Sequence, residues 1–247
     1  PDSFADENAY LDWEEASLQK LKAFGYSTEH LELLLRPMAA DGMEALGSMG
    51  NDAPLAFLSE TPRTVYDYFK QLFAQVTNPP VDPIRESIVM SCACYIGPEH
   101  NMLSTTEEHA SRLYLENPIL SMEELAALEN ISHRGWKSKV LDMTYDRTEG
   151  PPGLEVGLRR LCEEASNAIK EGYQFVILSD RNLSFARVRI SGLLAVAAVH
   201  QYLVSKAERT QIGVILDSGE PREVHHMCCL FGYGVDAVCP YMAYAAC

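Results

Sequence analysis

The second half of the chain alternates short apolar runs with longer amphipathic stretches, and this pattern restricts the fold more than any other feature. Buried strands are predicted at 174–178, 212–216 and 236–239, and a further strand at 139–145. Continuous apolar strands separated by helices are typical of a parallel sheet that is covered on both faces. We therefore predict an α/β fold whose repeats form part of a (β/α)8 barrel or a doubly wound sheet.

Helices are predicted between these strands. The apolar residues of 154–169 follow a helical stripe, and Gly172 stands where a helix commonly ends in a left-handed residue. Residues 192–206 are apolar almost all round, which predicts a helix that packs on two sides. The last helix is predicted at 221–231.

The first half of the chain is predicted to be mainly helical. Apolar residues recur at helical spacing over 31–38 and again over 61–76. The segment 78–83 contains three prolines and cannot continue a helix. We therefore divide the chain into a mainly helical part, 1–115, and a parallel βα part, 116–247, of one domain. Because the chain stops shortly after a strand, we also expect it to be a fragment of a longer protein.

The net charge excludes several classes of partner. The formal charge is −15, with 35 acidic against 20 basic residues, so nucleic acids and anionic membranes are repelled by the average field. The longest apolar stretch, 193–199 and a little beyond, is too short to span a bilayer. We predict a soluble, intracellular protein with no nucleic-acid or membrane partner; cytosol, mitochondrion and plastid stay open.

The seven cysteines indicate neither a disulfide framework nor a metal site. Their number is odd and no pair has the Cys-x-x-Cys spacing. Two histidines, His225 and His226, stand near Cys228 and Cys229, but adjacent residues on a helix point in directions roughly 100° apart and cannot converge on one ion. We predict no metal ligand and interpret the cysteines as buried and reduced.

In parallel α/β folds, ligands bind beyond the carboxyl ends of the strands. Here the turn 217–219 is expected to lead directly into a helix with Glu220, Pro221 and Glu223 in its first turn. The acids satisfy the helix dipole and the proline removes an amide donor, so little remains for an anion. We expect a structural turn with no cofactor-binding residue.

The other polar residues near the strand ends also have ordinary interpretations. Arg187 and Arg189 could bind an anion, but pairing with carboxylates is favoured. Residues 180–182 (Asp-Arg-Asn) follow a strand, yet no nucleophile-and-base partnership is visible. No catalytic residue is predicted.

Several long strings resemble the central domain of glutamate synthases. They are GSMGNDAPLA at 47–56, YDYFKQLFAQVTNPPVDPIRE at 66–86, DSGEPREVHH at 217–226 and GYGVDAVCPY at 232–241, with ENPIL at 116–120 and SDR at 179–181. The resemblance runs from about Phe24 to the end of the chain. Strings of this length are far more specific than any short motif.

The resemblance implies a place within a multidomain oxidoreductase of glutamate biosynthesis. In that family an amidotransferase domain hydrolyses glutamine, and a later (β/α)8 domain with FMN and an iron–sulfur cluster reduces the imine of 2-oxoglutarate and ammonia. The central domain lies between these two partner domains, is similar to a degenerate FMN barrel and helps to enclose the ammonia tunnel. We therefore expect no cofactor in this chain and no activity from the chain alone. The family leaves the electron donor open among NADH, NADPH and ferredoxin.

The tunnel role suggests two residues. The turn 75–80 offers the polar side chains of Thr77 and Asn78 beside two rigid prolines, and we hypothesise that it contributes to the tunnel wall; an ordinary rigid turn is equally compatible. Two alternatives belong to other classes: a stand-alone phosphate- or flavin-binding α/β module, and a regulatory binding domain.

Overall fold

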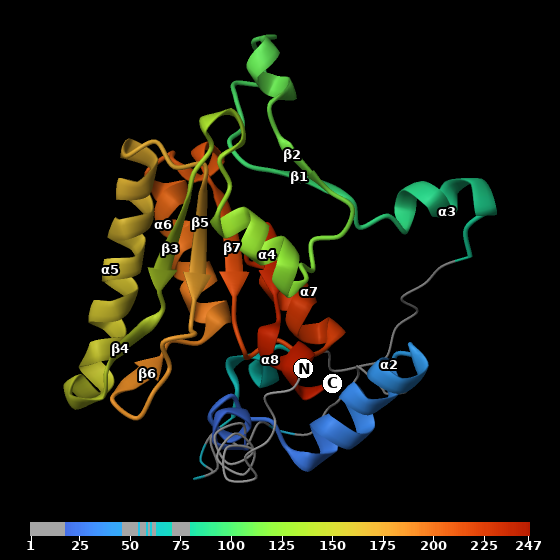
Figure 1. Cartoon of the computed structure of the whole chain (residues 1–247), viewed down its shortest axis with the longest axis vertical. Coiled ribbons are helices and arrows are strands. Elements are labelled where there is room, and N and C mark those ends of the chain that lie inside the picture. Colours follow the sequence, from blue (N-terminus) through green and yellow to red (C-terminus); the bar gives the residue numbers. More distant parts are fainter. Residues whose placement is uncertain (1–17, 46–53, 55–57, 59, 61–62, 71–79) are drawn as a thin grey trace, which may run out of the picture.

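The computed structural model describes residues 18–45, 54, 58, 60, 63–70 and 80–247. Its centre is a four-stranded parallel sheet in which the strands follow one another in chain order (Figure 1). These strands are β3 (Ser138–Asp142), β5 (Phe175–Ser179), β7 (Gly213–Asp217) and β8 (Ala237–Cys239). The predicted α/β class and parallel sheet are confirmed.

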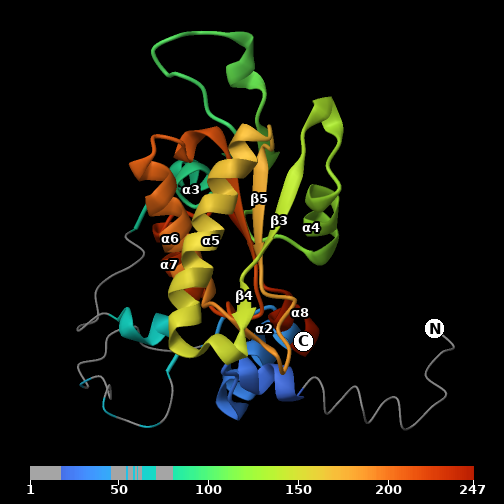
Figure 2. The ribbon, with the colours of Figure 1, turned by 90° about the vertical axis from the view of Figure 1, so that its left-hand side faces the viewer.

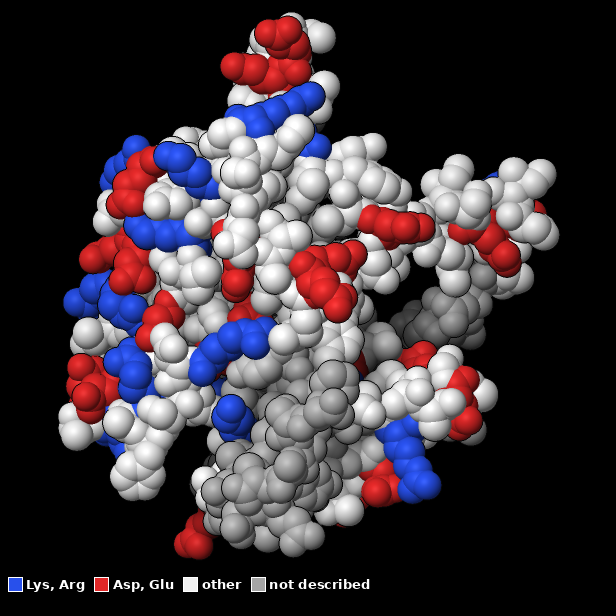
Figure 3. Space-filling view, in the orientation of Figure 1, with Lys and Arg blue, Asp and Glu red and all other residues white. Residues whose placement is uncertain are grey.

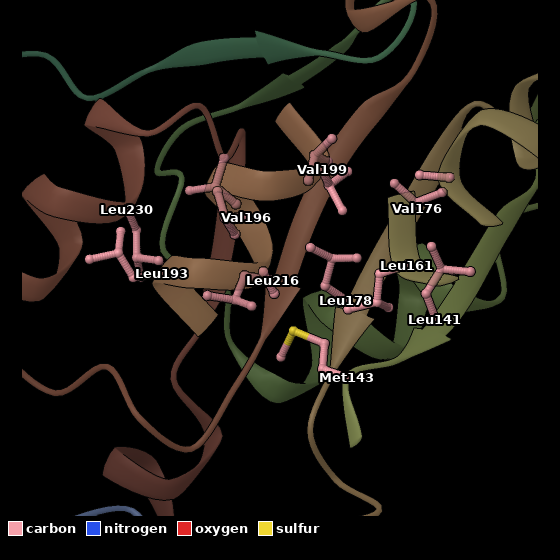
Figure 4. Packing of buried hydrophobic residues seen from close by; sticks show 14 of the residues in the cluster. Leu141, Met143, Leu161, Val176, Leu178, Leu193, Val196, Val199, Leu216 and Leu230 are labelled. Carbon is pink, nitrogen blue, oxygen red and sulfur yellow. The ribbon is translucent and has the colours of Figure 1, made fainter. Parts of the chain in front are cut away.

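Three helices connect successive strands and cover one face of the sheet (Figure 2). They are α5 (Gly150–Lys170), α6 (Gly192–Ser205) and α7 (Val224–Gly232). Because side chains alternate along a strand, Val176 and Leu178 point to this face and meet Leu161 of α5 and Val196 of α6 (Figure 4). This cluster is the main core of the molecule.

The opposite face of the sheet is covered by different elements. Leu125 and Leu128 of α4 (Met122–Glu129) pack with Phe175 and Ile177. An antiparallel pair, β1 (Cys94–Ile96) and β2 (Leu113–Leu115), joins the same cluster through its inward side chains. The pair was not predicted, since strands of three residues show too little alternation to be detected.

The predicted strand 139–145 is divided at Met143. The amide of Met143 donates to the carbonyl of Ser179, at 2.8 Å, and its carbonyl accepts from Ile190. The chain thus passes from the parallel sheet into a separate antiparallel ribbon of β4 (Thr144–Asp146) and β6 (Arg187–Arg189). This ribbon and α8 (Tyr241–Ala246) lie near the carboxyl ends of the parallel strands (Figure 1).

The first half of the chain differs from its prediction at the second helix. The helix over 31–38 is present as η1 (His30–Leu35) and α2 (Arg36–Asp41). The predicted helix 61–76 is wrong in its described part, which contains only the single turn η2 (Val65–Tyr68) before Phe69 adopts an extended conformation. Tertiary packing overrides the stripe, because the fully buried residue is Tyr66, which belongs to the main core.

The remaining elements are short. α3 (Pro83–Val89) begins after Asp82, whose carboxylate accepts a hydrogen bond from the amide of Arg85 at 3.0 Å. The other helical turns are η3 (Glu107–Ala110), η4 (His133–Gly135), η5 (Arg147–Glu149) and η6 (Arg209–Gln211). Within the described residues, none of the helices has the length and apolar character needed to cross a membrane.

Candidate functional site

The carboxyl ends of the parallel strands bring four polar residues together at one edge of the sheet. β5 ends at Ser179 and is followed by Asp180, while β7 ends at Asp217 and is followed by Ser218. All four side chains are buried. Ligands of parallel α/β sheets bind beyond this edge, which makes it the candidate functional site.

The carboxylate of Asp217 forms a bidentate ion pair with the guanidinium group of Arg181. The Nε atom of Arg181 lies 2.6 Å from one carboxylate oxygen and Nη2 lies 2.9 Å from the other. The hydroxyl of Ser179 donates to the same carboxylate at 2.8 Å, and the guanidinium group lies 4.3 Å from the ring centroid of Tyr241. A buried carboxylate is costly without such partners, so this pair stabilises the edge.

Asp180 is enclosed by three hydrogen-bond donors. They are the hydroxyl of Ser218, the hydroxyl of Tyr241 at 2.8 Å and the amide of Gly219 at 3.2 Å. Burial raises the pKa of Asp180 to about 6, although the three hydrogen bonds oppose the rise. The carboxyl group of Asp180 is held in place by hydrogen bonds from the protein.

Glu220 occupies the N-terminus of α6. Its Oε2 atom accepts hydrogen bonds from the amide of Gly192 at 2.9 Å and from the hydroxyl of Ser191 at 2.8 Å. Its Oε1 atom lies 2.9 Å from Nη1 of Arg189. Free amides at a helix N-terminus together with an arginine are the groups that bind an anion. Here the buried carboxylate of the protein itself takes that position.

This arrangement corrects the predicted helix 221–231. α7 begins only at Val224, so Glu220 and Pro221 precede it and do not lie in its first turn. The N-cap position belongs to Glu223, whose carboxylate pairs with Nε2 of His226 at 2.9 Å. Glu220 opposes anion binding at another helix, α6, and not at α7 as the sequence suggested.

Both arginines of β6 are paired with acidic residues. Nη2 of Arg187 lies 3.0 Å from Asp142, and its Nε donates to the hydroxyl of Thr144 at 2.6 Å. Arg189 is paired with Glu220 and also donates to the carbonyl of Ala23. Within the described residues, both guanidinium groups are thus paired with carboxylates of the same chain.

A segment near the start of the described chain covers the edge. The ring of Phe24 lies against Gly219, where a Cβ atom would stand only 2.6 Å from it. The hydroxyl of Tyr26 donates to the carbonyl of Gly219 at 3.1 Å. Buried Arg222 donates to the carbonyls of Phe24 and Gly25, at 3.0 and 2.9 Å. Glycine at 219 is therefore needed for close packing of this cover.

A small hollow remains beside the cover. It has a volume of about 260 Å³ and is lined by Lys20, Phe24, Arg181, Leu183 and Tyr241. This volume is below the roughly 300–1,000 Å³ of typical ligand pockets. Of its two cationic side chains, Arg181 is already paired with Asp217, and Lys20 is the other.

The remaining candidates from the sequence lie elsewhere. Thr77 and Asn78 fall outside the described residues. His200 accepts a hydrogen bond from Nε of Arg209 at 3.0 Å, the environment of a structural histidine. In the described part of the chain no cluster of three metal-ligating side chains occurs, and the seven cysteines are free. Cys92, Cys228 and Cys247 are exposed, which corrects the expectation that all are buried.

Two features of the site were missed from the sequence. Glu220 could have been assigned to α6, because α6 carries no acid in its own first turn to interact with its free amides. The packing of Phe24 over the edge could not be predicted from the sequence. Phe24 and Tyr26, which flank Gly25, resemble any short apolar segment.

The comparisons with known proteins agree on one family. The family model described as the glutamate synthase central domain matches residues 19–247. The chain is 50% identical over 226 residues to the NADH glutamate synthase of Schizosaccharomyces pombe, and 45% identical over 228 residues to the large chain of the NADPH glutamate synthase of Bacillus subtilis. It is 43% identical over 233 residues to the chloroplastic ferredoxin-dependent glutamate synthase of Spinacia oleracea.

The matched relatives are much longer than this chain. The alignments cover 91%, 92% and 93% of the chain, but only 11%, 15% and 14% of the three relatives, in the same order. The chain thus corresponds to a minor part of each relative.

Proposed function

Since the chain belongs to the family of glutamate synthase central domains, we propose that it links the glutamine amidotransferase and FMN synthase domains of a longer glutamate synthase. That parent is an oxidoreductase that forms glutamate from glutamine and 2-oxoglutarate, and this domain helps to form its ammonia tunnel. The two parts, 1–115 and 116–247, act as one domain. The parent works inside the cell.

One observation supports a non-catalytic role. The edge of the sheet at the carboxyl ends of its strands, here called the ligand edge, is filled by the protein's own side chains. Asp217 is paired with Arg181, and Glu220 takes the anion position at α6. These residues do not fit the phosphate of FMN, because that phosphate would compete with a buried carboxylate already bonded to Arg189. We therefore infer that the FMN of the parent belongs to another of its domains, and we infer the same for its iron–sulfur cluster because no two cysteines here have the Cys-x-x-Cys spacing.

The topology supports descent from a (β/α)8 barrel. Adjacent parallel strands in chain order, with their connecting helices all on one face, are the arrangement of consecutive barrel units. A doubly wound sheet would place the helices that connect its strands on both faces. The other face here is covered by α4 and the β1–β2 pair, so any barrel is degenerate.

The stand-alone phosphate- or flavin-binding module is the second candidate. The pairing of Arg187 and Arg189 with carboxylates disfavours it, because no arginine of the ribbon is left for a phosphate.

The tunnel role is tested by replacing Thr77 with Val in the full-length synthase. We expect more glutamine to be hydrolysed than glutamate formed, because a tunnel wall without its polar group holds ammonia less well. The exposed Thr210 provides the control, and Thr210→Val is expected to keep the two rates equal. Equal rates in Thr77→Val as well would refute the assignment of Thr77 to the tunnel.

A further inference from the structure

Residues 83–115, here called the arm, project from the sheet and expose large apolar side chains (Figure 1). Ile84 and Ile88 of α3 are 84% and 77% exposed, and Met102 and Leu103 near the tip are 92% and 96% exposed. Single exposed apolar residues are ordinary, but a series of them in one segment indicates an interaction site.

α3 buries no side chain against the rest of the chain. Ile84 and Ile88 stand four residues apart and therefore share one face of the helix. Val89, the last residue of α3, and Met90, its C-cap, are also exposed. An isolated helix of this length is marginal in water, and helices of proteins are stabilised mainly by packing of their apolar face. α3 lacks that packing within the described structure.

The β1–β2 pair has a second unpacked surface. Its inward side chains join the cluster around Phe175, whereas Tyr95 and Tyr114 form a cross-strand pair on the outer face with ring centroids 5.2 Å apart. Both tyrosine side chains are more than half exposed. Aromatic residues are enriched in the buried centres of protein interfaces, so this face is suited to a protein partner.

The charge distribution differs between the α5 side and the β1–β2 pair. In Figure 3 the side of the molecule that carries α5 is covered by a mixture of basic and acidic residues. The surface over the β1–β2 pair is mostly uncharged in the same view, whereas α3 carries Arg85 and Glu86 between its apolar residues. The uncharged face of the β1–β2 pair is typical of the charge-depleted centre of an interface.

We propose that α3 and the outer face of the β1–β2 pair form an interface that another domain of the same glutamate synthase polypeptide covers. This inference rests on the proposed place of the chain within a longer synthase, and it does not depend on the ammonia tunnel. The relatives supply the reason for this occupant, because this chain covers only 11% and 15% of two of them. The partner surface is apolar and poor in charge, to match Ile84, Ile88 and the tyrosine pair.

The direct test is photo-crosslinking in the full-length synthase, with Ile88 replaced by benzoylphenylalanine. We expect a cross-link within one polypeptide to a peptide outside residues 1–247. The matched control is the same replacement at Val156 of α5, which is 57% exposed on the charged side and is expected to give no such product. Cross-links only within residues 1–247, or a product with the mass of two polypeptides, would overturn the proposal, the latter in favour of a second copy.

A second variant tests the interface without a cross-linker. Ile88→Glu in the full-length synthase places a charge in the proposed contact, and we expect tryptic cleavage after Arg85 to become about tenfold faster. Val156→Glu is the control and is expected to leave that cleavage unchanged. Equal cleavage rates in both variants and the parent would contradict the interface. The Thr77→Val assay reports separately on the tunnel, so either proposal can fail without the other.

Discussion

The parallel sheet and the arm differ in how far their apolar side chains are exposed to solvent. Leu178 and Leu216 of the sheet are fully buried, and helices cover them. Ile84 and Ile88 of the arm stand almost free of contacts. The sheet is therefore specified by contacts within this chain, whereas α3 of the arm buries no side chain in the described structure. The buried carboxylates at the carboxyl ends of the strands are likewise paired within the chain.

The largest expected effect is the difference in unfolding free energy lost on truncating an apolar side chain in the sheet and one in the arm. Leu178→Ala leaves a cavity in the main core and is expected to lower the free energy of unfolding by about 3–4 kcal/mol. Ile88→Ala removes an exposed side chain and is expected to change it by less than about 0.5 kcal/mol. Urea unfolding of the 247-residue chain measures both. A cost at Ile88 close to that at Leu178 would show that the arm is packed on the chain itself.

The next effect concerns the ion pair at the ligand edge. Arg181→Ala leaves Asp217 buried without its partner and is expected to lower the free energy of unfolding by about 3 kcal/mol. Arg159→Ala breaks an exposed pair with Glu155, for which we expect less than about 0.5 kcal/mol. Thermal unfolding at neutral pH compares the two variants. Equal small losses would mean that the edge is not held by this pair.

A smaller effect is expected at the anion position of α6. Glu220→Ala removes the carboxylate from Ser191 and Gly192, and we expect a loss of about 2 kcal/mol. Acetate is expected to restore part of the melting temperature of this variant, because it can take the vacated position beside Arg189. Acetate is expected to leave the parent chain unchanged. No difference between the two responses would contradict the assignment of Glu220 to an anion position.

The smallest effect is the pH dependence that Asp180 contributes. Its pKa, raised to about 6 in the folded chain, exceeds the ordinary value near 4. Between these two values the folded state binds a proton that the unfolded state has released. The stability from Asp180 is therefore fully present below about pH 4 and is lost as the pH rises through about 6.

Asp180→Asn tests that contribution. Relative to this variant, the parent chain is expected to lose about 2 kcal/mol between pH 4 and pH 7. Ile88→Asn in the arm removes no titrating group and serves as the control. A constant difference between parent and Asp180→Asn across this range would show that Asp180 titrates normally.

The sequence predicts the sheet well because each βα unit buries its own apolar residues. The strands near 174–178 and 212–216 and the helix over 192–206 lie within a residue or two of their predicted bounds. The predicted helix over 61–76 fails in its described part, 63–70, for the opposite reason, since the position of Tyr66 is decided by packing against distant α6 and α7. Local spacing carries no information on such contacts.

The contacts of the candidate site were not predicted. The acidic residues after β7 were expected to act at the helix that follows them, but Glu220 lies at the N-terminus of α6 instead. Its actual partner, the amide of Gly192, could not be identified from neighbouring residues. The packing of Phe24 on Gly219 joins segments from opposite ends of the chain, and a single sequence does not reveal which distant segments meet.

The central claim is that the ligand edge is closed by the protein's own side chains. Titration of the 247-residue chain with FMN, followed by quenching of flavin fluorescence, tests it most directly. We predict no saturable binding up to about 100 µM flavin, because Glu220 and Asp217 already bind Arg189 and Arg181 at the edge. Saturable quenching in the low micromolar range would contradict this account and favour a flavin-binding module.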